Sequence, residues 1–267
     1  MKKIIVLIFI FLNILYADKK YNLNDVVEDQ KSHVWKEKKS KKLANGFVSG
    51  TMPNGSTKEF TLKNGKLNGT YRMYDDNGPS FTENYVNGVM HGLELTYSLS
   101  VPYQIMSKTE YVNGKKEGKS YFYNSDDGLL SVITTYNNDI KQEEKIFYKS
   151  GNLKELTKYD NGEMESILMY YESGKLLGEW KLSSSNMWNG KIFYKNGNLK
   201  SEMYGNPKTH SGKITTYHKN SDKEYEIFLQ NEDEFYGYEY KNNKKYDLTY
   251  AQIHNYLKSR ENWNGEE

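Results

Sequence analysis

The residues of this sequence best able to do catalytic chemistry are its 35 acidic residues and its five histidines. The sequence contains no cysteine and therefore has no thiol nucleophile. The histidines show no spacing typical of a metal site; they are His33, His91, His210, His218 and His254. His91 stands just before a hairpin glycine and His210 at the matching place in a later unit, so both are expected to be solvated turn residues.

The acidic residues could in principle supply the carboxylate pair of a glycosidase. Such a pair must converge across a cleft, and the single-layer sheet predicted below offers no obvious cleft. The sequence therefore predicts a protein that is not an enzyme and that uses no cofactor and no metal ion.

Tyrosine, with 25 copies, is the residue type whose spacing is informative. One register recurs at intervals of 23, 23, 26, 25, 23, 23, 23 and 23 residues: Thr51, Tyr74, Tyr97, Tyr123, Tyr148, Tyr171, Tyr194, Tyr217 and Tyr240, which we call the anchor residues. A fixed period of this size is typical of a repeat protein, in which one small unit stacks on its neighbours.

Each unit has the pattern of a β-hairpin. In residues 111–123 a strand ends at Asn113-Gly114 and the next begins after Gly118, and the same arrangement recurs in residues 62–74, 85–97 and 159–171. Asn-Gly tolerates the positive φ angles of a tight hairpin turn. A second turn follows the anchor in residues 148–153, 171–176 and 194–199. We therefore predict an all-β, elongated single-layer antiparallel meander of about sixteen strands, with a short C-terminal helix.

Some units depart from this pattern. In the unit after residues 111–123, Asp139 occupies the position that corresponds to Gly114, and Glu143 the position that corresponds to Gly118. A looser turn is therefore expected in that unit. Pro102 lies in an insertion after Tyr97 and cannot donate to a strand ladder, which predicts a longer loop or a bulge.

A second aromatic and aliphatic ladder has nearly the same period: Leu62, Tyr85, Tyr111, Tyr136, Tyr159, Leu182, Tyr204 and Phe228. Equivalent residues of successive hairpins should lie about 9.6 Å apart, with another strand between them. Two interpretations remain open. In the first, both ladders are cross-strand packing. In the second, one face of the sheet presents exposed rings that stack on sugars or receive a protein partner.

The sequence divides into four segments. Residues 1–17 have a positively charged start and an apolar run of about twelve residues, too short for a spanning helix, and are predicted to be a signal peptide. Residues 18–33 form a lead-in, in which residues 24–28 are either a short strand or disordered. Residues 34–245 form the repeat array.

Residues 246–267 form a C-terminal helix and tail. Tyr250, Ile253 and Leu257 share one helical face behind Asp247 as a candidate N-cap. A cap on the last repeat is the expected role of this helix, and partner binding is the alternative.

The net charge argues against two classes of partner. Removal of Lys2 and Lys3 with the signal peptide leaves 35 basic and 35 acidic residues. A neutral chain is not expected to bind nucleic acid or an anionic membrane surface. The lysines between Lys36 and Lys42 are expected to be a solvated edge. With a signal peptide and no cysteine, the protein is predicted to be periplasmic or secreted from a bacterium.

The string Tyr-x-Asn-Gly-x-x-x-Gly-x-x-x-x-Tyr followed by x-x-Gly-x-Leu resembles the MORN-repeat variant of bacterial proteins, including the YwqK-type antitoxins. The resemblance covers roughly residues 30–245. It implies scaffold, membrane-associated or antitoxin-like roles, although YwqK-type antitoxins imply a cytoplasmic partner and this chain carries an export signal.

The favoured function is an exported, non-enzymatic platform that binds a protein or, alternatively, a glycan. An antitoxin- or immunity-like protein that masks a toxin is the second hypothesis, and a membrane-surface MORN module is the third. The sequence does not assign binding residues or an oligomeric state.

Overall fold

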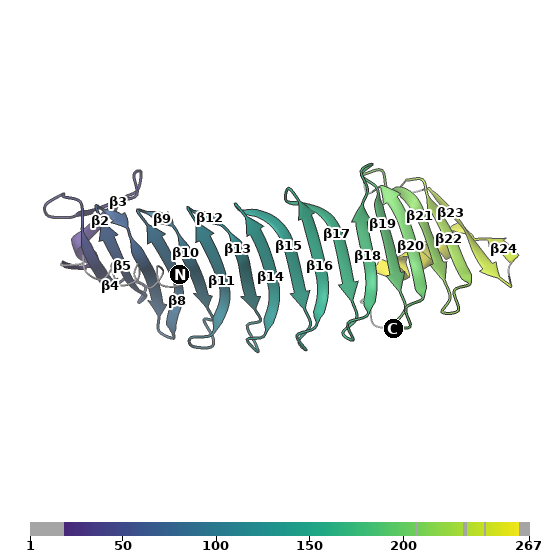
Figure 1. Ribbon diagram of the computed structural model, residues 1–267, viewed down its shortest axis with the longest axis horizontal. Helices are drawn as coiled ribbons and strands as arrows, with labels where there is room; N and C mark the ends of the chain where they lie inside the picture. Colours follow the sequence, from purple (N-terminus) through teal and green to yellow (C-terminus); the bar gives the residue numbers. More distant parts are fainter. Residues whose placement is uncertain (1–18, 207, 232–233, 243, 262–267) are drawn as a thin grey trace, which may run out of the picture. The chain divides into compact units, whose positions relative to one another are not determined.

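The structure is a computed structural model that describes residues 19–206, 208–231, 234–242 and 244–261. The predicted signal peptide, residues 1–17, lies outside the described residues. The chain divides into two compact units, residues 1–140 and 141–267. Each unit is a single-layer β-meander built from successive hairpins, as predicted (Figure 1).

The N-terminal unit contains the following elements: β1 (Lys20–Asn22), η2 (Leu23–Asp25, a 3₁₀ turn), β2 (Val26–Asp29), β3 (Val34–Glu37), β4 (Gly46–Thr51), β5 (Thr57–Lys63), β6 (Lys66–Leu67), β7 (Gly69–Asp75), β8 (Gly78–Val86), β9 (Val89–Met90), β10 (Gly92–Tyr97), β11 (Ile105–Val112), β12 (Lys115–Lys116), β13 (Gly118–Tyr123) and β14 (Leu130–Asn137). From β4 onward, neighbours in sequence pair antiparallel. β1 is an exception, because it pairs parallel with β4.

The C-terminal unit contains the following elements: β15 (Ile140–Phe147), β16 (Leu153–Asp160), β17 (Glu163–Tyr170), β18 (Leu176–Leu182), β19 (Trp188–Phe193), β20 (Leu199–Asn206), β21 (Ser211–Tyr217), β22 (Lys223–Leu229), β23 (Phe235–Lys241), β24 (Lys244–Asp247) and α2 (Tyr250–Glu261). Each of these strands pairs antiparallel with the next.

The turn chemistry is as the sequence predicts. Asn113 has a φ of 52° and Gly114 a φ of 83°, the left-handed conformation that an Asn-Gly turn requires. Asn138 and Asp139 take the same conformation without a glycine, at 51° and 70°. The predicted loop around Pro102 joins β10 to β11, and the register of that pair shifts between Thr96 and Tyr97.

A β-bulge follows the anchor-residue turn in seven successive hairpins, which the sequence analysis did not predict. At each of them one residue has no partner opposite: Ser80, Met106, Ser131, Lys154, Leu177, Lys200 and Glu224. A bulge increases the local twist of the strand pair. The 23-residue repeat therefore contains an irregular position as well as two regular strands.

In the N-terminal unit, consecutive Asn-Gly turns are joined to one another by side chains. The backbone N–H of Asn87 donates to Oδ1 of Asn68 at 3.1 Å, and the N–H of Asn138 donates to Oε2 of Glu117 at 2.9 Å. Nδ1 of His91 accepts from the N–H of Asn113 at 3.4 Å in the same way. His91 is therefore a residue that links two turns, and not merely the solvated turn residue that the sequence suggested.

The lead-in is ordered into β1, η2 and the hairpin β2–β3, which resolves the alternative left open for residues 24–28. Together with the first repeat strands it forms a small core of Tyr21, Val26, Ala44, Val48, Phe60 and Leu62. The Trp35 ring lies 4.8 Å from the Phe60 ring. This hairpin covers the apolar face of the first repeat, a role that repeat arrays need at each end.

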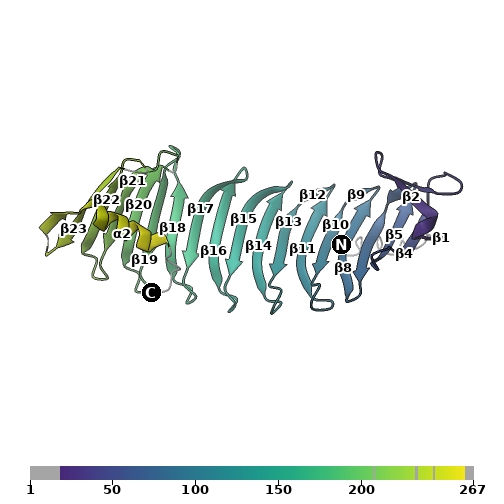
Figure 2. The same cartoon turned by 180° about the vertical axis from the view of Figure 1, so that it is seen from behind.

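α2 covers the last repeats of the C-terminal unit and lies across one face of its strands (Figure 2). Ile253 is 1% exposed, and the ring of Tyr256 lies 5.2 Å from that of Tyr225 in β22. The prediction of Asp247 as N-cap is wrong, because this residue ends β24. Thr249 caps the helix instead: its N–H donates to Oε1 of Gln252, and its Oγ1 accepts from the N–H of Gln252.

Candidate functional site

The candidate site lies on the face of the C-terminal unit opposite α2, which we call the open face. Tyr225 in β22 points to the helix, so its neighbours Glu226 and Phe228 point away from it, because successive strand residues alternate between faces. Residues paired directly across neighbouring strands share a face. The pairing registers therefore assign the rest of the open face.

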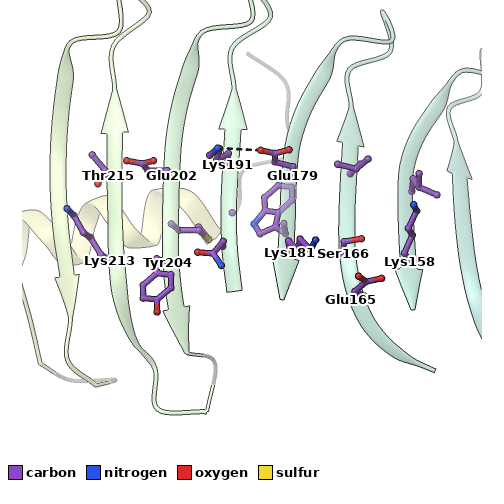
Figure 3. A pocket seen from close by; sticks show the side chains of 16 residues that line it. Lys158, Glu165, Ser166, Glu179, Lys181, Lys191, Glu202, Tyr204, Lys213 and Thr215 are labelled. Carbon is purple, nitrogen blue, oxygen red and sulfur yellow. Dashed lines mark ion pairs between the residues drawn. The ribbon is translucent and has the colours of Figure 1, made fainter. Parts of the chain in front are cut away.

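Two parallel rows of side chains cross the strands of this face. The first, which we call the lysine–tyrosine row, runs through Lys158, Ser166, Lys181, Asn189, Tyr204, Lys213, Phe228 and Tyr236. The second, the glutamate row, runs through Leu168, Glu179, Lys191, Glu202, Thr215, Glu226 and Tyr238. A groove of about 590 Å³ lies along both rows from β16 to β21, and Figure 3 shows the side chains that line it.

The floor of the groove is the sheet itself. Trp180 lies between Glu179 and Lys181 in β18 and so faces the other side, where its ring covers Gly178 and Gly190. A Cβ atom at either glycine would come within about 2.6 Å of the ring. The two glycines thus let Trp180 lie flat on the face that also carries α2.

The carboxylates of the glutamate row have lysine or tyrosine partners. Glu226 accepts from Nζ of Lys213 at 2.7 Å, from Nζ of Lys223 at 3.3 Å and from the hydroxyl of Tyr240 at 2.8 Å. Burial opposes ionisation of this carboxyl, but these hydrogen bonds outweigh it and lower its pKa to about 2.

Glu202 accepts from the hydroxyl of Tyr217 at 2.6 Å. Burial first, and then this hydrogen bond, raise the pKa of Tyr217 to about 12. Glu179 lies 3.7 Å from Nζ of Lys191 (Figure 3).

The lysine–tyrosine row contains no carboxylate. Among the residues that the structure describes, no carboxylate lies within ion-pair distance of the ammonium groups of Lys158 or Lys181, and both side chains are exposed. Ser166 and Asn189 lie beside them on the neighbouring strands. This part of the row offers free cations together with uncharged hydrogen-bonding groups.

The row ends in aromatic rings. Phe228 and Tyr236 stack with centroids 4.8 Å apart and planes at 8°, and Tyr238 meets both rings edge-on. Tyr204 is 50% exposed and Tyr236 is 43% exposed. Rings held this way on an open sheet can stack on a flat ligand.

The anchor tyrosines make a different, structural ladder. The hydroxyls of Tyr148, Tyr171 and Tyr194 donate to the carbonyl oxygens of Tyr170, Phe193 and Tyr217 at 2.7–2.8 Å. Each of these three anchors therefore bonds to the backbone 22 or 23 residues further on, in the next hairpin. Their geometry agrees with the packing interpretation of this ladder.

The second ladder of the sequence analysis is split between the faces. Leu182 follows Lys181 and faces α2, whereas Tyr204 pairs with Asn189 and Phe228 with Lys213 on the open face. Tyr159 and Leu182 come six residues after Leu153 and Leu176, but Tyr204 and Phe228 come five residues after Leu199 and Lys223. A shift of one residue along a strand moves a side chain to the other face. Counting the residues from the start of each strand could therefore have revealed from the sequence that this ladder is split between the faces.

The histidines outside the open face lie apart from one another in the described part of the chain. His33 lies 3.1 Å from Glu28, and His218 lies 3.9 Å from Glu224, both on exposed turns. Within the described parts of the chain, no three His, Cys, Asp or Glu residues are arranged to hold a metal ion. No helix in these parts has the length and apolar character needed to span a membrane.

Comparison with known proteins gave no family. No protein-family model matches the chain, and no curated protein matches it. Among solved structures it is similar to the crystal structure of a porin-like protein from Bacteroides uniformis, with a TM-score of 0.22 and 9% sequence identity over 72% of this chain and 87% of the other. A likeness at this level carries no argument about function.

Proposed function

We propose that the protein is an exported, non-enzymatic binding platform and that the open face of the C-terminal unit receives a macromolecule. The observation that carries the proposal is the exposure of Tyr204 and Tyr236 in one row with the stacked ring of Phe228. Exposed aromatic side chains on a regular surface are typical of recognition sites.

The contacts of the other aromatic residues support this choice. The anchor tyrosines of the C-terminal unit, from Tyr148 to Tyr240, donate their hydroxyls to backbone carbonyls or to Glu202 and Glu226, so they belong to the scaffold. Tyr204 and Tyr236 have no comparable hydrogen bond among the described residues. Their rings and hydroxyls are thus available to a partner.

Binding without turnover is the chemistry that these groups favour. The groove lies open on the sheet, and the carboxylate of Glu226 beside it is held as an anion by its lysine and tyrosine partners. A general acid needs a raised carboxyl pKa, whereas that of Glu226 is lowered. The predicted signal peptide supports export to the periplasm or the exterior.

The test is capture of macromolecules from periplasmic extract and from a glycan panel by the full mature chain and by the double variant Tyr204→Ser/Tyr236→Ser. Tyr246→Ser is the matched control, because Tyr246 is 49% exposed but pairs with Glu239, which pairs with Tyr225 on the helix side. We expect the double variant to stay folded and lose the ligand, and the control to keep it. Equal capture by all three proteins, or recovery of a chemically altered ligand, would overturn the proposal.

A further inference from the structure

The spacing of the lysine–tyrosine row has a consequence for ligand class. Lys158, Lys181 and Tyr204 are 23 residues apart and lie on alternate strands, β16, β18 and β20. Strands lie about 4.8 Å apart, so these side chains recur about every 9.6 Å across the sheet. An extended sugar chain presents its disaccharides at a repeat of the same order.

The charge of the lysine–tyrosine row favours a ligand that carries negative charge. Lys158, Lys181 and Lys213 are the charged residues of the lysine–tyrosine row, and all three are cationic. The nearby glutamates Glu202 and Glu226 are bound by Tyr217, Tyr240 and lysine side chains. Because Lys213 is paired with Glu226, a chain lying along the row meets the free ammonium groups of Lys158 and Lys181. Glu165 also lines this part of the groove, beside Ser166, so it is these two lysines, and not the groove as a whole, that favour an anion.

The uncharged residues select the chemical class. Ser166 and Asn189 alternate with the two lysines and offer a hydroxyl and an amide to sugar hydroxyls. Tyr204 and then Phe228 and Tyr236 continue the row as ring surfaces on which the apolar face of a sugar can stack.

From this juxtaposition we infer that the open face binds an anionic polysaccharide with about one acidic group per disaccharide, laid across the strands from β16 to β23. Its acidic groups pair with Lys158 and Lys181, and its sugar rings stack on Tyr204 and Tyr236. The inference rests on the proposed function and names the class of its ligand.

Hyaluronan oligosaccharides are the probe, because they carry one carboxylate per disaccharide, and carboxyl-reduced hyaluronan is the uncharged control. Titration calorimetry of the full mature chain should show binding of the first and much weaker binding of the second. The double variant Lys158→Gln/Lys181→Gln should bind about tenfold more weakly, since each exposed pair contributes modestly. Lys63→Gln/Lys115→Gln, at the exposed ends of β5 and β12 in the N-terminal unit, removes the same charge and should bind normally.

Three results would overturn the inference: no binding of hyaluronan by the folded protein, equal binding of the carboxyl-reduced form, or equal affinity of the two lysine variants. Tighter binding of single-stranded DNA through the same lysines would assign the row to nucleic acid and would also overturn it. If one of these results is found but the tyrosine double variant loses a different macromolecule in the capture experiment, the proposed binding platform is supported and only the inferred ligand class is wrong.

Discussion

The hydroxyl of Tyr171 donates to the carbonyl oxygen of Phe193 at 2.8 Å, 22 residues further along the chain. The ring of Tyr171 is buried, and its hydrogen bond joins one hairpin to the next within the sheet. Tyr148 and Tyr194 repeat the contact in the hairpins before and after it. In these three hairpins the sequence period thus coincides with a recurring inter-hairpin hydrogen bond.

Removal of that hydroxyl tests its contribution. Tyr171→Phe should lower the free energy of unfolding by roughly 0.5–1.5 kcal/mol, because the Phe193 carbonyl loses its side-chain donor. Chemical denaturation measures the effect. Tyr246→Phe, which removes an exposed hydroxyl, is the control and should change stability by less than about 0.5 kcal/mol.

The two kinds of turn should respond differently to valine. Gly114→Val places a β-branched residue at a φ of 83° with its Cβ 3.3 Å from Val89, which should cost more than about 1–2 kcal/mol. Asp139→Val also places a β-branched residue at a positive φ, of 70°, and loses the hydrogen bond from the N–H of Lys116 to Oδ1 at 2.7 Å. It adds no new Cβ contact, however, because aspartate already has a Cβ atom, so it should cost less than Gly114→Val. Melting temperatures compare the two. Equal shifts would contradict the turn register described above.

Acid should weaken the C-terminal unit through Glu226. Its pKa is lowered from 4.5 to about 2 in the folded state, so its stabilising contribution is present above pH 4.5 and is lost as the pH falls from about 4.5 to about 2. At about 1.4 kcal/mol per pKa unit this contribution is at most about 3 kcal/mol, and the half-exposed lysine partners reduce it by screening. Denaturation of Glu226→Gln across this range should show a smaller loss than the parent. An identical pH dependence would exclude Glu226 as the cause.

The end cap can be tested at Ile253. Ile253→Ala removes a fully buried side chain between α2 and the sheet and should cost roughly 2–4 kcal/mol. Asn255→Ala, on the exposed side of the same helix, should leave stability nearly unchanged. Unfolding monitored for the two variants checks this, and equal stability would mean that the helix does not protect the sheet.

The hairpins could be predicted because their signals are local. Asn113-Gly114 requires a conformation that few other residue pairs adopt, and its recurrence at the same spacing defines the repeat. The links from Asn68, His91 and Glu117 to the next turn could not be predicted, because they join residues that become neighbours only once the hairpins stack. The same holds for the end cap, where Thr249 with Gln252 replaces the more obvious Asp247.

The candidate site was only partly visible in the sequence. Aromatic periodicity indicated a face with exposed rings, but it assigned Tyr204 and Phe228 to the same ladder as Tyr159. The difference of one residue in their distance from the preceding turn reverses their face. The cationic row of Lys158 and Lys181 was missed because lysine is common at exposed strand positions, where it usually serves solubility.

Hydroxyl-radical footprinting of tyrosine side chains, with and without hyaluronan oligosaccharides, tests most directly whether the open face of the C-terminal unit is the binding surface. Tyr204 and Tyr236 should be protected by the ligand, whereas Tyr246 and Tyr250, which are similarly or more exposed and belong to β24 and α2, should react equally in both samples. Unchanged labelling of Tyr204 and Tyr236, with or without protection elsewhere, would contradict the account.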